Sequence, residues 1–270
     1  MRRSLVARDN LDALVVATHN ALHGEIVAAG LEQGRHIFCE YPTSRRPAEW
    51  SRIASLIEGS DVLRLTHNAH VSEEHLALSD SVQSSAPLLS KFLRLTPGRG
   101  KRPEVLFNLY LSSPPALFFV YEIHPYVKLF GKAETVHCEA HYEGLHDDAS
   151  YDRFTTCLTV RFQNGARSQW TWAGGISIDA AIQEARIVSH GATFIEAKEA
   201  WDIATPTGTT PLEFVDNDTT LETLFLDDIR GGTDWQADVR TDLEADRISL
   251  AAEVSATEGR VVEVDEIGSL

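Results

Sequence analysis

The sequence is poor in several features that mark particular classes of protein. Its 270 residues contain 3 cysteines and no Cys-x-x-Cys pair, which gives no support to a disulfide framework or a zinc ribbon. No apolar run approaches the ~20 residues that a membrane-spanning helix needs. Basic residues are outnumbered, with 24 Lys and Arg against 40 Asp and Glu and a formal net charge of −16. An acidic surface repels phosphate groups, so we expect no nucleic-acid partner and no membrane partner.

The N-terminal residues do not have the pattern of a secretory signal peptide. Met1-Arg2-Arg3 resembles the start of a signal peptide, but Arg8, Asp9, Asn10 and Asp12 interrupt any apolar segment behind it. We therefore expect a cytoplasmic protein. With 43% hydrophobic residues the composition is that of an ordinary globular chain, and a chain of this length buries roughly three quarters of its unfolded surface.

The first part of the chain alternates short apolar runs with amphipathic segments. A continuous apolar run is typical of a parallel strand that is covered on both faces, and Gly34 stands where a helix C-terminal cap belongs. The pattern predicts strands over 11–18, 36–40 and 62–66, and helices over 23–33 and 48–58. This strand–helix alternation predicts a partial, Rossmann-like parallel sheet within residues 1–86.

After residue 86 the pattern changes to longer strands with fewer helices. The segment Gln163-Asn164-Gly165-Ala166 is a strong hairpin signal. We predict strands over 134–143, 155–162, 167–173 and 184–196, a helix over 115–130, and helices on either side of 230–232 within 220–258. The overall fold class is therefore α/β, with a truncated Rossmann-like parallel sheet followed by an α+β domain, residues 87–270, whose open sheet is largely antiparallel.

Two motifs and the end of the chain resemble a known family. Ala17-Thr18-His19-Asn20 follows the first predicted strand, and Cys39-Glu40-Tyr41-Pro42 follows the second. Together with residues 224–232 and 259–264, they are similar to the Gfo/Idh/MocA oxidoreductases. Tyr41 and the stretch 63–76 resemble the biliverdin reductase branch of that family.

The resemblance also shows what this sequence does not contain. A Rossmann domain holds the cofactor diphosphate on a Gly-x-Gly-x-x-Gly turn, and no such turn is present. By the resemblance, roughly sixty residues of a first βαβαβ half are lacking. We therefore expect no cofactor, and an uncovered apolar strand edge at residues 14–18. That edge or the C-terminal sheet is the expected contact of a homo-oligomer.

Three residues are candidate catalytic groups. The resemblance places Tyr41 at the position of a catalytic lysine and matches His124 to the histidine of the family site, while the aspartate that accompanies it aligns with Val120. Glu122 offers a carboxylate nearby. On a regular helix Glu122 and His124 project about 200° apart, so both reach one site only near a helix end or bend. For His124, an ordinary hydrogen-bonded core histidine is the alternative.

Further polar and aromatic residues are candidates for binding a small-molecule substrate. They are His19, Asn20, His67, Tyr121 and Trp172. His19 or Asn20 could instead cap the following helix, and Trp172 could belong to the core. The His-x-x-His spacing that begins at His67 is weak evidence for a metal, and we expect none.

Three functions compete. The first is a cofactor-independent, redox-neutral enzyme that acts on a carbonyl or imine of a small aromatic amine-type substrate, such as a Pictet–Spengler cyclase of secondary metabolism, in which Glu122 or His124 moves protons and Tyr41 donates a hydrogen bond. The second is an NAD(P)H-dependent reductase of the Gfo/Idh/MocA type. The third is a non-catalytic partner of a full-length paralogue.

Overall fold

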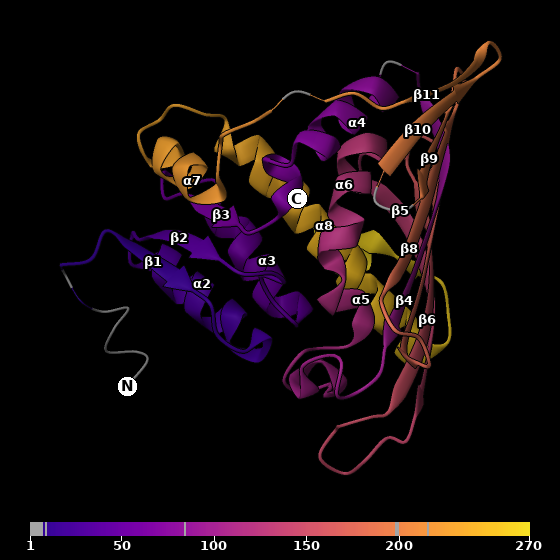
Figure 1. Ribbon diagram of the computed structural model, residues 1–270. Coiled ribbons are helices and arrows are strands. Elements are labelled where there is room, and N and C mark those ends of the chain that lie inside the picture. The colour runs from indigo at the N-terminus through magenta and orange to yellow at the C-terminus, as the bar shows by residue number, and fades with distance from the viewer. Residues whose placement is uncertain (1–7, 9, 84, 198–199, 215) are drawn as a thin grey trace.

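The computed structural model describes residues 8, 10–83, 85–197, 200–214 and 216–270 (Figure 1). A small parallel sheet has the strand order β1-β2-β3, and helices connect its strands. The elements are β1 (Ala13–Val16), α2 (His23–Glu32), β2 (His36–Cys39), α3 (Pro47–Leu56) and β3 (Leu63–Leu65). The predicted α/β character is confirmed.

A larger mixed sheet follows. Its strands are β4 (Pro87–Pro97), β5 (Ala133–Glu143), β6 (Arg153–Phe162), β7 (Arg167–Ile176), β8 (Ile182–Ser189), β9 (Thr193–Ala197), β10 (Ala200–Thr205), β11 (Gly208–Pro211) and β12 (Val262–Glu263). The order is β11-β10-β9-β8-β4-β7-β6-β5-β12. Only the β4–β7 pair is parallel among these described strands, which confirms a largely antiparallel sheet.

Local sequence explains the turn between β6 and β7. Gly165 has a φ of 90°, a conformation that side chains disfavour, and Asn164 Oδ1 accepts a hydrogen bond of 3.0 Å from the backbone N–H of Ala166. The predicted hairpin is thus present. Its closed turn sets the register that places Trp170 and Trp172 on the buried face of the sheet.

Helices cover one face of the large sheet and extend to the small one. They are α4 (Glu73–Gln83), α5 (Pro115–Phe118), α6 (Val120–Phe130), α7 (Leu221–Ile229) and α8 (Trp235–Glu258), and four short 3-10 turns lie at Asn20–Leu22, Asn68–His70, Glu104–Phe107 and Val264–Glu266. The helix expected over 115–130 is interrupted at Phe119, and the strand expected over 184–196 is two strands. Among the described helices, none combines the length and apolarity needed to cross a membrane.

Helix α8 joins the two sheets, as Figure 1 shows. Asp246 Oδ2 accepts a hydrogen bond of 2.8 Å from the N–H of Thr43, which follows β2. Glu244 Oε1 accepts one of 2.8 Å from the N–H of Ala133 at the start of β5. Residues two apart lie on nearly opposite sides of a helix. One side of α8 is therefore hydrogen-bonded to the small-sheet region and the other side to the large sheet.

Strand β1 forms one edge of the small sheet. Val15 is 74% exposed, whereas its neighbours Leu14 and Val16 are buried. Val15 therefore projects from an open face of the small sheet, and the uncovered edge expected at residues 14–18 stays a prediction. Association of copies through this edge or through the large sheet stays a prediction.

Candidate functional site

A cavity of about 330 Å³ lies between the ends of β2 and β3 and the helix-covered face of the large sheet. Strands β4, β8, β9 and β10 form one wall, and α4 and α6 form another. The residues that line it are Tyr41, Thr66, Asn68, Ala69, Glu74, His75, Leu78, Phe92, Arg94, Tyr121, Glu122, Pro125, Tyr126, Leu129, Gln183, Ile187, Glu196 and Trp201. The cavity adjoins the carboxyl edge of a parallel sheet, where ligands of open α/β folds bind.

Glu122 is the buried acid of this cavity. Its side chain is 4% exposed, and Oε1 lies 2.6 Å from Nη1 of Arg94 on β4. Trp172 Nε1 on β7 donates a hydrogen bond to Oε2. Burial raises the pKa of Glu122 to about 7, although Arg94, Trp172 and Tyr121 oppose that rise. This carboxyl therefore gains or loses a proton near neutral pH.

Tyr41 faces the same cavity from the small sheet. It follows β2 and is half-buried, and its ring lies against Tyr121 with 5.0 Å between the centroids. Burial, with Glu40 and Glu122 nearby, raises the pKa of Tyr41 to about 12. The phenol is thus protonated over the physiological range and can donate a hydrogen bond to an oxygen or nitrogen atom in the cavity.

Behind Tyr41, a ring column leads into the core. We give this name to Tyr41, His67 and His124, whose neighbouring rings are stacked with centroid distances of 5.2 and 4.4 Å and interplanar angles of 10° and 5°. His67 and His124 are buried, and burial lowers the pKa of both imidazoles. Neither histidine is among the residues that line the cavity, so both lie behind its wall, and their role in a site stays a prediction.

Asp242 of α8 stands at the base of the column. Its Oδ1 lies 2.8 Å from Nε2 of His124 and 2.7 Å from Nε2 of His70. Burial alone would raise the pKa of Asp242, but His70 and His124 lower it well below its usual value. These three residues could in principle ligate a metal. The short N–O distances fit hydrogen bonds to the carboxylate, since ligand atoms around a zinc ion stand farther apart.

The loop after β1 carries two of the predicted substrate ligands. The side chain of His19 is exposed and makes no capping hydrogen bond to the 3-10 turn that follows it in the chain. Asn20 Nδ2 donates to the carbonyl of Ser112 at 2.9 Å. Buried His23 links this loop to the one after β2, since its ring nitrogens lie 3.1 Å from the carbonyl of Thr18 and 2.8 Å from that of Pro42.

The structure thus brings together only some of the predicted site residues. Tyr41, Tyr121 and Glu122 share the cavity, His19 and Asn20 lie on the β1 loop, and Trp172 is a fully buried residue that holds Glu122. The roles of all these residues stay predictions. Sequence reasoning missed Arg94 and Gln183, which reach the cavity from strands that pair with each other across 89 residues of chain.

Comparisons with known proteins identify what the chain is similar to. A family model described as "Oxidoreductase family, NAD-binding Rossmann fold", Gfo/Idh/MocA, matches residues 2–68. The myo-inositol 2-dehydrogenase of Thermotoga maritima is 27% identical over 123 residues, which span 45% of this chain and 36% of that dehydrogenase.

Solved structures show the same fold. Biliverdin reductase from Synechocystis sp. PCC 6803, in complex with biliverdin and NADP+, is 17% identical with a TM-score of 0.83, covering 95% of this chain and 83% of that one. Levoglucosan dehydrogenase in complex with NADH is also 17% identical, with a TM-score of 0.75 over 97% of this chain and 82% of that one.

The expectation that no cofactor takes part is wrong. The matching family model is that of NAD-binding oxidoreductases, and the two similar structures contain NADP+ or NADH. The missing glycine turn was therefore not sufficient ground to exclude a nucleotide. The resemblance itself is confirmed, since residues 2–68 match the model of the Gfo/Idh/MocA oxidoreductases and the chain shares its fold with the solved structures above.

Proposed function

We propose that the protein is an NAD(P)-dependent oxidoreductase that reduces a carbonyl or imine group of a small molecule held in the 330 Å³ cavity, or oxidises the corresponding alcohol or amine. The comparisons support this alternative over a redox-neutral cyclase and over a non-catalytic partner.

One observation carries the proposal at the level of residues. Tyr41, which follows β2, and Glu122 of α6 face one cavity, one as a protonated phenol and the other as a carboxyl whose pKa is about 7. A carbonyl reduction needs a hydrogen-bond donor to polarise the oxygen and a proton that is delivered to it. In this proposal Tyr41 orients the substrate oxygen or nitrogen, and Glu122 supplies the proton in the direction of reduction.

A nicotinamide cofactor would lie at the carboxyl edge of the small sheet. Thr18 and His19 follow β1 and Tyr41 follows β2, at the sheet edge that such ligands use. No helix among the described residues begins at a Gly-x-Gly-x-x-Gly turn, so they do not supply that diphosphate cradle. When bound, the cofactor would supply or accept a hydride, while this chain's residues bind the substrate and move the proton.

Titration of the purified protein with NADH and NADPH, followed by calorimetry and by nicotinamide fluorescence, tests the proposal directly. We expect saturable binding and cofactor-dependent turnover within a panel of small aldehydes, ketones and imines. Tyr41→Phe should lower kcat/KM at least tenfold, while Tyr110→Phe, at a tyrosine that is 64% exposed, should leave it unchanged.

The pH profile adds a second readout. Reduction should slow as the pH rises through about 7, because Glu122 then loses its proton, and Glu122→Gln should lower the rate and remove this dependence. Absence of binding for both nucleotides would overturn the proposal. So would condensation of an amine with an aldehyde that proceeds equally well without them.

A further inference from the structure

The 330 Å³ cavity has a polar end, where its charged side chains are bonded to one another. Arg94 of β4 stands opposite Gln183 of β8, and its Nη1 donates to Oε1 of Gln183 at 3.2 Å and lies 2.6 Å from Oε1 of Glu122. Nε2 of Gln183 donates in turn to Oε1 of Glu196 on β9 at 2.7 Å. Much of the hydrogen-bonding capacity of these groups is therefore used before a ligand enters.

The sheet wall of the cavity becomes apolar with distance from this polar end. Phe92 lies two residues from Arg94 on β4, and Ile187 lies four residues from Gln183 on β8. Because the two strands are antiparallel, both steps lead in the same direction across the sheet. Even spacing keeps these side chains on the face that lines the cavity, and both are buried.

Helix α6, on the facing wall, changes polarity in the same way. Tyr126 and Leu129 follow Glu122 by one and two turns, on the same side of the helix, and both are buried. The seven residues from Glu122 to Leu129 correspond to about 10 Å along the helix axis. The ring of Tyr126 lies 6.4 Å from that of Phe92, measured between centroids, so the apolar parts of the two walls face each other.

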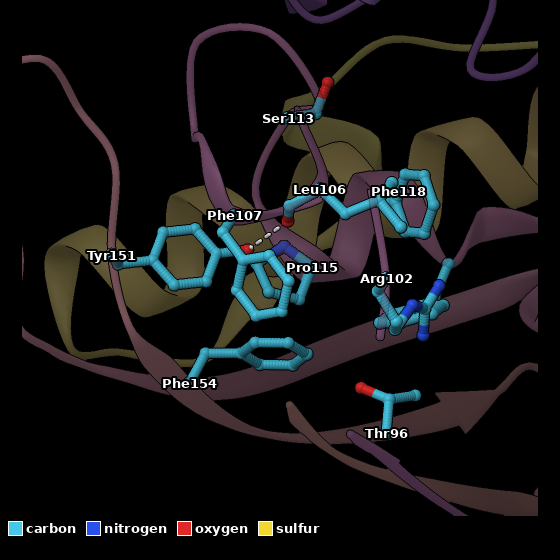
Figure 2. Close-up of a pocket in the computed structure, with 10 residues that line it drawn as sticks. Thr96, Arg102, Leu106, Phe107, Ser113, Pro115, Phe118, Tyr151 and Phe154 are labelled. Atoms are coloured by element: carbon cyan, nitrogen blue, oxygen red, sulfur yellow. Dashed lines mark hydrogen bonds between the residues drawn. The ribbon is translucent and has the colours of Figure 1, made fainter. Parts of the chain in front are cut away.

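A second cavity, drawn in Figure 2, has no room for a ring. Its volume is about 20 Å³, and one water-sized group needs about 10–15 Å³ on this measure. Within its aromatic wall the hydroxyl of Tyr151 donates to the carbonyl of Leu106 at 2.8 Å. Among the described residues, none lines both cavities. The larger cavity is thus where a ring-sized ligand fits.

We propose that the substrates of the proposed oxidoreductase carry their carbonyl or imine group on an apolar body about as long as one aromatic ring and its linker, within the ~10 Å that α6 spans here. The reacting group lies at Tyr41 and Glu122, and the body lies between Phe92 and Leu129. The word substrate rests on the proposed function, whereas the orientation and the preference for an apolar body rest on the cavity alone. A polyol would lose hydrogen bonds to water at the apolar end without replacing them.

Binding of 4-phenylbutan-2-one and butan-2-one, measured by calorimetry and ligand-observed NMR without any nicotinamide, tests the inference. The phenyl ketone should bind more tightly by about tenfold or more, because its ring reaches the apolar end. Tyr41→Phe should weaken the binding of both ketones by the same factor, since both place the carbonyl at the polar end.

Variants that fill the apolar end distinguish the two ketones. Leu129→Phe should lower the ratio of the two affinities to about one, because the added ring occupies the space of the ligand's own ring. Lys128→Phe adds the same ring to the neighbouring residue of α6, which is outside the cavity lining, and should leave the ratio unchanged. Ile187→Phe fills the same end from β8 and provides the test if thermal unfolding shows that Leu129→Phe is not folded.

Three results would overturn the inference. They are equal affinity of the parent protein for the two ketones, an undiminished preference for the phenyl ketone in the folded filling variants, and competition by myo-inositol as tight as that by the phenyl ketone. No turnover is measured, so the result stays readable if the oxidoreductase proposal fails. Conversely, nicotinamide-dependent turnover of polyols without binding of the phenyl ketone would refute this inference and leave the oxidoreductase proposal standing.

Discussion

Glu122 is a buried ionisable residue, and its burial makes the stability of the protein depend on pH. Its pKa rises from 4.5 to about 7 on folding, so the folded state holds the proton more tightly than the unfolded state. Stability from this group is therefore full below pH 4.5 and is lost as the pH rises through 7. A shift of that size corresponds to about 3 kcal/mol.

We accordingly predict that Glu122→Gln flattens the pH dependence of unfolding. The free energy of unfolding of the parent protein should fall relative to that of the variant by about 3 kcal/mol between pH 4.5 and 8 in urea titrations. Glu139→Gln, at an exposed carboxylate, serves as the control. Parallel curves for the parent and Glu122→Gln would contradict the prediction.

The positions of some site residues could be predicted from the sequence, and those of others could not. The 200° between Glu122 and His124 on a helix could be read directly, and in the structure Glu122 turns to Arg94 while His124 turns to Asp242. The sequence could not show which of the two side chains faces the cavity. That depends on the packing of α6 against α8, which lies more than a hundred residues later in the chain. Arg94 carried no signal at all, since an arginine in an apolar strand is equally typical of an exposed face.

At the scale of elements, Arg64 holds β3 to both C-terminal helices. Its side chain is 1% exposed and lies 2.7 Å from carboxylate oxygens of Asp228 on α7 and Asp238 on α8. The side chain of Asp228 is fully buried and that of Asp238 is 35% exposed. Removing one partner of a buried pair leaves an uncompensated charge.

We predict that Asp228→Asn lowers the free energy of unfolding by about 3–5 kcal/mol, as is typical of a broken buried pair. Asp238→Asn should lower it by about 1 kcal/mol or less, because water screens the exposed partner. Urea unfolding monitored by circular dichroism compares the two variants. Equal losses would show that burial does not govern the strength of these contacts.

The sequence was most informative about elements with regular local patterns. The short apolar strands β1 to β3 and the Asn164-Gly165 turn were predicted close to their observed bounds. Strand β4 was missed because a register shift between Pro87 and Leu89 breaks its alternation and leaves Leu88 and Leu89 both exposed. The parallel β4–β7 pairing joins segments too far apart for any local pattern to indicate.

At the scale of the whole molecule, helix α8 is hydrogen-bonded to both sheet regions. Asp246 and Glu244 bond the two regions from opposite sides of the helix, and Trp50 Nε1 of α3 donates to the carbonyl of Leu243 at 2.8 Å. A division of the chain after residue 86 therefore separates the strands of the small sheet from the helix that covers them. Neither region can keep its buried polar groups paired without α8.

We thus predict a single cooperative thermal transition. Near-ultraviolet and far-ultraviolet circular dichroism should give coincident curves, and the calorimetric and van't Hoff enthalpies should agree. Replacing both Asp246 and Glu244 by alanine should separate the transitions or abolish folding. Two resolved transitions in the parent protein would show that the sheets unfold independently.

The ring column described above has a consequence for how specificity changes. The Tyr41 ring, which the proposed function places against the substrate, is stacked on His67, His67 is stacked on His124, and His124 is bonded to the buried carboxylate of Asp242. A substitution deep inside would therefore re-aim the phenol while every atom of the binding surface stayed chemically the same. Substitutions in the protein interior would thus change ligand specificity without changing any residue that lines the cavity.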